Sequence, residues 1–177
     1  MRHRILLNQE EIARRVGALA LEIAAFYEGR EVTLVAIYNG AVLFAADLLR
    51  NLDLPVRFET LSVASYEGTE SSGKVAFLQK RLPDLEGRHV LLVDDVLDTG
   101  KTLAAVKRRL LWETAPESLR TVVLLRKAKA AAAGLSADWT GFEIGNEFVI
   151  GYGLDLNGRY RNLPYVAVVE EPAEALE

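Results

Sequence analysis

A chain of 177 residues with a formal net charge of −4 is long enough for a sizeable hydrophobic core, and residues 1–177 are interpreted as a single domain. The acidic balance argues against a nucleic-acid surface, which usually carries a basic excess. Because the chain has no cysteine, disulfides, thiolate metal sites and cysteine nucleophiles are excluded. Any metal chemistry should therefore use oxygen ligands, which favours hard cations such as Mg²⁺.

In the first half of the chain, a long helical pattern is followed by alternating strands and helices. In residues 9–27, apolar side chains recur at helical spacing on one face: Ile12, Val16, Leu19, Ile23 and Phe26. A β-branched strand follows over residues 32–37, then a second helix over 41–50 and a strand over 55–64. Residues 65–74 are polar and contain glycine, which is typical of a loop.

Strands and helices also alternate in the second half. The clearest buried strand covers residues 89–93, a helix is expected over 102–112, and further strands over 119–125, 148–150 and 165–169. This alternation predicts an α/β protein with a parallel sheet. Ligands bind beyond the carboxyl ends of such strands, so the site is expected in the loops that follow them.

No apolar run approaches the ~20 residues that cross a bilayer, and the basic start of the chain is followed by only three apolar residues. We therefore expect neither a transmembrane helix nor a secretory signal, no contact with a membrane, and a cytoplasmic protein.

Three carboxylates follow the strand that ends at residue 93, namely Asp94, Asp95 and Asp98. Their placement is costly unless solvent, a metal or donor groups satisfy them. One interpretation is a solvated turn in which Asp98 or Thr99 caps the next helix. Capping needs one such residue, however, and three are present, which favours a functional site.

The segment from residue 98 to residue 102 predicts a phosphate site. It is a loop-to-helix junction, where free backbone N–H groups and the helix dipole attract an anion. Gly100 lets the backbone approach closely, and the hydroxyls of Thr99 and Thr102 add donors. Asp94 and Asp95 only accept, which suits sugar hydroxyls or a hydrated metal. A phosphate beside a vicinal diol describes a ribose 5-phosphate.

A nucleoside-triphosphate P-loop is the main competing interpretation, because residues 100–102 end in the same Gly-Lys-Thr. That motif requires a glycine five residues before Gly100, where this chain has Asp95. The neighbouring carboxylates would also repel a triphosphate.

Residues 90–102 resemble the phosphoribosyl-pyrophosphate signature of type I phosphoribosyltransferases: four apolar residues, two acids, two apolar residues, then Asp-Thr-Gly-Lys-Thr. Residues 142–161 resemble the purine-binding hood of the hypoxanthine-guanine branch, and Ser65 and Tyr66 with the polar loop to Gly73 resemble its mobile active-site loop. The resemblance extends from about residue 35 to residue 169. It implies a central parallel sheet flanked by helices, with a small hood built from the terminal segments.

The resemblance also implies a role for each candidate residue. Asp98 is assigned as the catalytic base near purine N7. The residues assigned to phosphoribosyl pyrophosphate are Asp94, Asp95, Asp98, Thr99, Gly100, Lys101, Thr102, Asn39, Gly40, Ser65, Tyr66 and Arg161. Those assigned to the base are Lys127, Phe148, Val149 and Asp155, and those assigned to Mg²⁺ are Asp94, Asp95 and Asp155.

Some of these assignments have plain structural alternatives. Lys127 would donate to the exocyclic oxygen of a 6-oxopurine and fits that role better than Lys129, but both would also suit a charged surface. Phe148 would stack on the base, although its alternation with Ile150 and Tyr152 is typical of a half-buried strand and, without the resemblance, favours a core position. Composition alone does not separate Arg161 from Arg159.

One position departs from the family pattern. The pyrophosphate loop after the first strand usually carries a basic residue before glycine, with an unusual cis peptide bond. Here the segment is Ile37-Tyr38-Asn39-Gly40, so the basic side chain is replaced by Asn39. Backbone donors remain, but direct charge neutralisation by that side chain is lost.

The implied activity is transfer of a 5-phosphoribosyl group from phosphoribosyl pyrophosphate to hypoxanthine or guanine, with Mg²⁺, by a homodimer or homotetramer. The polar loop over residues 65–74 would close over the substrates. Two alternatives stay open: an enzyme of the same fold that uses xanthine, adenine or a pyrimidine, and a regulator of this fold that binds RNA.

Overall fold

The computed structural model describes residues 2–65, 75–79 and 81–170. The strands are β1 (His3–Leu7), β2 (Val32–Tyr38), β3 (Val56–Ser65), β4 (Val75–Phe77), β5 (His89–Leu97), β6 (Ser118–Lys127), β7 (Trp139–Ile144), β8 (Val149–Ile150) and β9 (Val166–Val169). The helices are α1 (Gln9–Tyr27), α2 (Val42–Asn51), α3 (Lys101–Thr114) and α4 (Ala128–Ala132). Most of the segment expected to be a loop, including Tyr66, lies outside the described residues.

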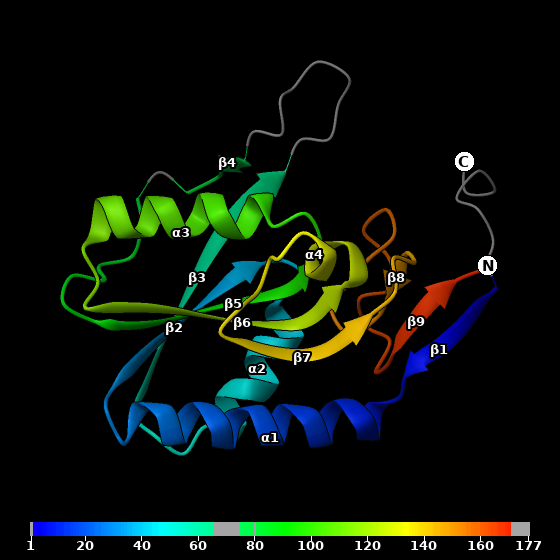
Figure 1. The fold of residues 1–177 in the computed structure, drawn as a ribbon, viewed down its shortest axis with the longest axis horizontal. Helices are drawn as coiled ribbons and strands as arrows, with labels where there is room; N and C mark the ends of the chain where they lie inside the picture. Colours follow the sequence, from blue (N-terminus) through cyan, green and yellow to red (C-terminus); the bar gives the residue numbers. More distant parts are fainter. Residues whose placement is uncertain (1, 66–74, 80, 171–177) are drawn as a thin grey trace.

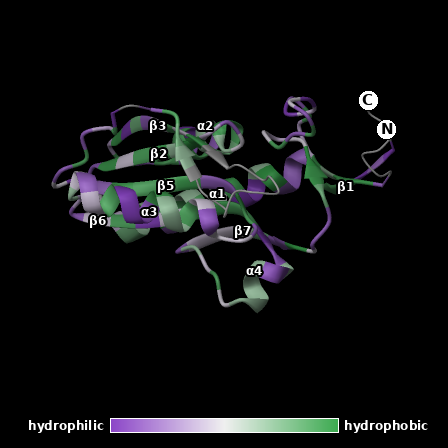
Figure 2. Cartoon of the chain, turned by 90° about the horizontal axis from the view of Figure 1, so that it is seen from above, coloured by the Kyte–Doolittle hydropathy of each residue, from purple (hydrophilic) through white to green (hydrophobic). Residues whose placement is uncertain are grey.

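The main sheet has six strands in the order β4-β3-β2-β5-β6-β7. Its strands are parallel except β4, which is antiparallel to β3. Helices α1 and α2 cover one face and α3 covers the other (Figure 1). Apolar residues follow the central strands through the middle of the molecule, while α3 carries polar stretches (Figure 2). The predicted α/β fold with a parallel sheet is confirmed.

The first helix begins with a reciprocal cap. The Asn8 side chain accepts from the backbone N–H of Glu11 at 2.9 Å, and the Glu11 carboxylate accepts from the N–H of Asn8 at 2.8 Å. The predicted inward face is confirmed up to Ile23, but Phe26 is 43% exposed. The last inward position is Tyr27, which is fully buried beside the rings of His89 and Trp139. Both residues fit helical spacing from Ile23, so the sequence did not separate them.

Strand β5 is longer than predicted. It continues to Leu97, because Asp94 pairs with Val123 and Val96 with Leu125 of β6. Asp94 and Asp95 therefore lie within a strand. Helix α3 then begins at Lys101, with Gly100 as its N-cap at φ 71° and no side-chain cap hydrogen bond. The interpretation of Asp98 or Thr99 as the helix cap is wrong.

A small second sheet, with strand order β1-β9-β8, forms the expected hood at one end of the main sheet (Figure 1). Its first strand comes from the amino terminus, and β1 pairs antiparallel with β9. The sequence pattern alone predicts neither β1, β4 and β7 nor α4. Among the described residues, no helix is both long and apolar enough to span a membrane.

Candidate active site

The phosphate loop lies at the carboxyl end of β5. A cavity of about 60 Å³ is lined by Asp94, Val96, Leu97, Asp98, Thr99, Gly100, Lys101, Thr102 and Leu103. This exceeds the roughly 10–15 Å³ that a cavity needs to hold one water molecule, so it suits a group of a few heavy atoms. The first turn of α3, whose N–H groups are free of intrahelical partners, follows directly. The residues predicted to bind phosphate are thus brought together.

Next to this cavity, two adjacent carboxylates are held by backbone donors. Asp94 accepts from the N–H of Asp95 at 3.0 Å, and Asp95 accepts from the N–H of Val96 at 2.7 Å. Burial, and then the negative charge of Asp95, raises the pKa of Asp94 well above its usual value. Burial also raises the pKa of Asp95, against the hydrogen bond from Val96. The protein has placed two acids where ionisation is costly, which is unusual outside a functional site.

The backbone after β2 contacts these acids and the hood at once. A Cβ atom at Gly40 would lie 1.6 Å from Oδ2 of Asp95. A Cβ atom at Gly153, where φ is +99°, would lie 2.1 Å from the carbonyl oxygen of Gly40. A side chain at Gly153 would clash with backbone, and one at Gly40 would displace the Asp95 carboxylate. Three segments far apart in the sequence therefore meet within van der Waals contact beside Asp95.

The predicted pyrophosphate loop follows the family pattern in its backbone. The peptide bond between Tyr38 and Asn39 is cis. The side chains of Tyr38 and Asn39 are exposed, and the Asn39 carbonyl accepts from the N–H of Val42 at 3.3 Å. Asn39 thus presents a neutral side chain at the position of the family's usual cation.

On the other side of the phosphate loop, Asp98 contacts a lysine at the carboxyl end of β6. Lys127 Nζ lies 3.2 Å from Oδ2 of Asp98, and Lys127 is only 9% exposed. The alternative of a surface lysine is therefore wrong for Lys127. Lys129 Nζ lies 2.5 Å from Oδ1 of the same carboxylate, a contact that the sequence analysis missed.

Burial of Asp98 raises its pKa, but the hydrogen bonds and charges of Lys129 and Lys127 outweigh burial and lower the pKa below its usual value. Asp98 is therefore ionised at neutral pH. An ionised carboxylate beside a buried ammonium offers one acceptor and one donor to a heterocycle.

The residues assigned to the base ring lie at the start of the hood. Phe148 is 52% exposed, whereas Val149 and Ile150 are buried in β8. The interpretation of Phe148 as a core residue is therefore wrong. An exposed aromatic ring at the end of a rigid strand suits stacking on a flat ligand.

The turns that follow β8 hold an arginine. One Arg161 nitrogen donates to the carbonyl of Gly153 at 2.6 Å, and another lies 2.7 Å from Oδ1 of Asp155. Asp155 Oδ2 accepts from the N–H of Gly158 at 2.7 Å. Of the two arginines that composition left open, Arg161 is the one fixed beside Gly153. Its positive charge partly opposes the rise that burial causes in the pKa of Asp95.

The donor set fits Mg²⁺ in its chemistry. Within the described part of the chain, no three acidic or histidine side chains cluster to hold a metal by themselves. Mg²⁺ commonly uses only one or two carboxylates together with water and substrate phosphates. Asp94 and Asp95 supply oxygens whose charges repel each other, which a divalent cation would relieve. Both oxygens of Asp155 are already engaged, so an ion there would share the carboxylate with Arg161.

This arrangement of strand, acids and phosphate loop defines a phosphoribosyltransferase. Residues 4–157 match the phosphoribosyl transferase domain family. The chain is 42% identical to the hypoxanthine-guanine phosphoribosyltransferase of Mycobacterium avium, over 94% of this chain and 85% of that protein.

Solved structures agree with this match. A hypoxanthine-guanine phosphoribosyltransferase of Bacillus anthracis is similar with a TM-score of 0.86 and 36% identity, covering 94% of this chain and 98% of the other. The hypoxanthine phosphoribosyltransferase of Trypanosoma cruzi in complex with the product IMP has a TM-score of 0.84 and 40% identity, covering 93% and 92%. The chain belongs to the phosphoribosyltransferase family and, within it, to the hypoxanthine-guanine phosphoribosyltransferases.

Proposed function

We propose that this enzyme transfers the 5-phosphoribosyl group from phosphoribosyl pyrophosphate to a 6-oxopurine, hypoxanthine or guanine, forming IMP or GMP and releasing pyrophosphate. The observation that carries the proposal is the pair of Asp98 and the buried Lys127, 3.2 Å apart, beside the phosphate cavity. The pair offers an acceptor for a ring N–H and a donor for an exocyclic oxygen. The relatives named above bear this activity in their names.

For the phosphoribosyl group, the proposed roles follow the geometry. The first turn of α3 with Thr99, Lys101 and Thr102 would bind the 5-phosphate through backbone and hydroxyl donors. Asp94 and Asp95 would accept from the ribose hydroxyls. Their negative charge would also stabilise a cationic ribose as its bond to pyrophosphate breaks.

The leaving pyrophosphate would be bound by the backbone N–H groups of Asn39 and Gly40 and by the guanidinium of Arg161, whose fork suits a polyphosphate. Mg²⁺, when bound, would neutralise part of the pyrophosphate charge, and Asp94, Asp95 and Asp155 are the residues proposed to hold it. Ser65 and Tyr66 remain predicted contacts. The Ser65 side chain and all of Tyr66 lie outside what the structure describes.

The base would be held between Phe148 and the strand ends, with its edge read by the Val149 backbone and, beyond it, Asp155. As a ring nitrogen forms its bond to the ribose carbon C1′, the bond from C1′ to the pyrophosphate oxygen breaks. The proton that the purine ring loses would pass to Asp98, which can accept it because its carboxylate is ionised at neutral pH. Lys127 would meanwhile donate to the base's exocyclic oxygen.

The proposal is tested by incubating the purified protein with phosphoribosyl pyrophosphate, Mg²⁺ and each of hypoxanthine, guanine, xanthine and adenine, and measuring nucleotide. We expect hypoxanthine or guanine to give the highest kcat/KM. Preference for xanthine or adenine would instead support the other same-fold enzymes. Failure to form any nucleotide would favour a regulatory protein. Light scattering of the same sample would test the proposed homodimer or homotetramer.

A further inference from the structure

The carboxylate of Asp98 is paired with two ammonium groups, one on each oxygen. Lys127 Nζ lies 3.2 Å from Oδ2, and Lys129 Nζ lies 2.5 Å from Oδ1. The two lysines differ in burial, since the side chain of Lys127 is 11% exposed and that of Lys129 is 48% exposed. Two positive charges thus contact a single carboxylate.

The backbone of Lys129 is fixed relative to the base site. Its N–H donates to Oδ1 of Asn146 at 2.9 Å, which ties the first turn of α4 to the segment between β7 and β8. That segment leads directly to Phe148. The stretch after α4 also contacts the phosphate loop, because a Cβ atom at Gly100 would lie 2.9 Å from Leu135. Lys129 is therefore carried by a turn that is anchored on both sides of the site.

The proposed reaction makes a conflicting demand on Lys127. Its ammonium must turn towards the exocyclic oxygen of the incoming base, while the partly buried Asp98 still needs a counter-charge. Removing one partner of such a pair leaves part of the charge uncompensated, which is unfavourable where solvent reaches the carboxylate only partly. Lys129 approaches the opposite oxygen and so can remain on Asp98 while Lys127 moves.

We propose that Lys129 is a positioning residue for base binding, which holds the Asp98 carboxylate and so frees Lys127 to donate to the base. The inference rests on the proposed function and deepens it by assigning separate tasks to the two lysines. Without Lys129, Asp98 would retain Lys127, and the exocyclic oxygen of the base would lose its donor.

The kinetic test compares Lys129→Met with wild type, using Lys129→Arg as the conservative variant and Lys107→Met on α3 as the matched control. In Lys129→Met, KM for hypoxanthine should rise about tenfold. This rise corresponds to the loss of the charge-assisted hydrogen bond from Lys127 to the exocyclic oxygen of the base. The value of kcat and the KM for phosphoribosyl pyrophosphate should stay within about threefold. Lys129→Arg should restore most of the affinity, and Lys107→Met should behave as wild type.

A double-mutant cycle separates this role from simple loss of charge. In a Lys127→Met background no lysine has to be released, so adding Lys129→Met should leave KM for hypoxanthine unchanged within about twofold. Equal effects of Lys129→Met in both backgrounds would overturn the inference. So would an unchanged KM in the single variant, or a loss that Lys129→Arg does not restore.

A second measurement does not depend on turnover. The charged groups that contact Asp98 are Lys127 from β6 and Lys129 from α4. Asp94 and Asp95 precede it on β5, and Arg126 of β6, which pairs with Leu97 in the sheet, contacts Glu143. The carboxyl ¹³C signal of Asp98 should titrate at higher pH in Lys129→Met than in wild type or Lys107→Met. No difference would overturn the inference. If wild type forms no nucleotide while this titration shift is present, the proposed function fails and the contact stands.

Discussion

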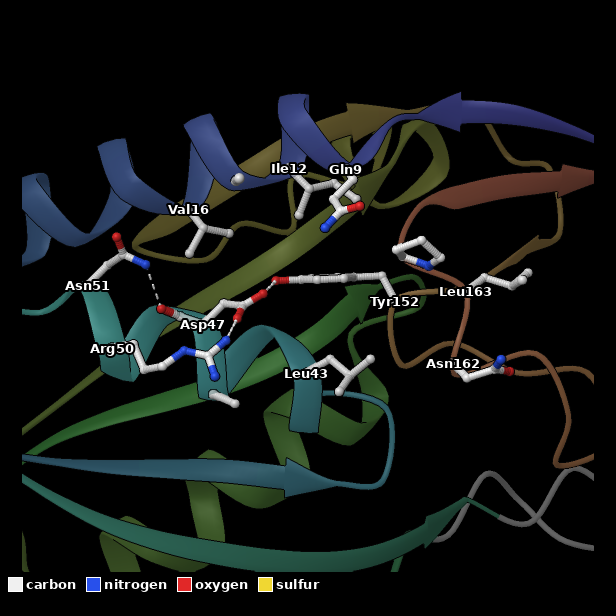
Figure 3. Close-up of a pocket in the computed structure, with 13 residues that line it drawn as sticks. Gln9, Ile12, Val16, Leu43, Asp47, Arg50, Asn51, Tyr152, Asn162 and Leu163 are labelled. Carbon is white, nitrogen blue, oxygen red and sulfur yellow. Dashed lines mark hydrogen bonds and ion pairs between the residues drawn. The ribbon is translucent and has the colours of Figure 1, made fainter.

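The hydroxyl of Tyr152 donates to Oδ2 of Asp47 at 2.5 Å, joining the hood to α2 across 105 positions of sequence (Figure 3). Asp47 also pairs with Arg50, and its carbonyl accepts from the side chain of Asn51 at 2.8 Å. These groups line a cavity of about 530 Å³ between α1, α2 and the hood. Since α2 follows Gly40 and Tyr152 precedes Gly153, the bond fixes the two glycine contacts beside Asp95.

Replacing Tyr152 with phenylalanine removes this bond and little else. Burial, and then the hydrogen bond to Asp47, raises the pKa of Tyr152, so the hydroxyl is a donor at neutral pH. A hydrogen bond to a charged group contributes about 1.5–3 kcal/mol, and Tyr152→Phe should lower the unfolding free energy by that amount. Denaturant titration measures it. Tyr165→Phe is the matched control, because that hydroxyl meets His3 at an exposed site. Equal losses in both variants would refute the assignment.

Gly153→Ala should disrupt the contact between the hood and the pyrophosphate loop. The added Cβ would lie 2.1 Å from the Gly40 carbonyl oxygen, which is backbone and cannot turn away. Gly158→Ala is the control, since Gly158 also has a positive φ (+76°) but no atom within 4 Å of the added Cβ. The control should cost about 1–2 kcal/mol from backbone conformation alone. Gly153→Ala should cost clearly more and weaken binding of phosphoribosyl pyrophosphate. Equal stability and affinity of the two variants would show that the backbone at Gly40 can move to accept a side chain at position 153.

The hydrogen bonds of the Asp138 carboxylate should make the free energy of unfolding depend on pH. Its Oδ2 accepts from the N–H and the hydroxyl of Thr121, both at 2.8 Å, and its Oδ1 accepts from Arg120 at 2.8 Å. Burial raises the pKa of Asp138, but the hydrogen bonds from Arg120 and Thr121 outweigh it and lower the pKa. The folded state therefore favours the ionised form. This stabilisation is present above the unfolded value of about 3.9 and is lost as pH falls through the lower folded pKa.

Asp138→Asn should thus lower the unfolding free energy at pH 7 by about 1–3 kcal/mol. The gap from wild type should narrow as the pH falls below about 4, because the wild-type carboxyl is then also neutral. Urea titrations at pH 7 and at pH 3 give both values, with the exposed Asp53→Asn as control. A gap that is independent of pH would contradict the ionised assignment.

The sequence was sufficient where a local pattern carries the information. Strand periodicity predicted β2 and β5, and the dense motif from Asp94 to Thr102 predicted residues that the structure brings together around one cavity. The predicted end of β5 was less accurate, because polar residues such as Asp94 and Asp95 are typical of loops. Pairing with β6 keeps them in the strand. Local chemistry thus identified the candidate residues but not their backbone conformation.

Other features depend on contacts between distant segments, which one sequence does not reveal. Strand β7 contains Gly141, which weakens its pattern, yet a Cβ there would lie 2.4 Å from the Leu124 carbonyl of β6. The bond of Tyr152 to Asp47 and the contact of Lys129 with Asp98 arise in the same way. For Lys127, by contrast, only the family resemblance favoured a base-binding role over a charged surface position.

Activity should require a divalent, oxygen-liganded cation, because the candidate ligands are carboxylates and the chain lacks cysteine. Excess chelator should abolish nucleotide formation, and added Mg²⁺ should restore it. Asp94→Asn should raise the Mg²⁺ concentration needed for half-maximal rate, whereas Asp84→Asn, at an exposed site, should not. Full turnover in excess chelator would exclude a metal requirement.

Lys127 provides the most direct test of base specificity. Lysine ammonium only donates, so it favours a 6-oxopurine, whose O6 accepts, over adenine, whose amino group presents donors. A site built to hydrogen-bond one group can reject an analogue lacking it by ~10⁴-fold or more. Lys127→Ala should therefore lower kcat/KM for hypoxanthine about 100-fold and shrink the preference over adenine, while binding of phosphoribosyl pyrophosphate changes little.

The comparison needs the ratio of kcat/KM for hypoxanthine to that for adenine in wild type, Lys127→Ala and Lys107→Ala. Because Lys127 is buried against Asp98, thermal unfolding of each variant must show that it is folded. The Lys107 variant should retain the wild-type ratio, since that residue lies on α3 away from the base-binding residues. A ratio that is unchanged in a folded Lys127→Ala protein would mean that Lys127 balances the charge of Asp98 and does not contact the base.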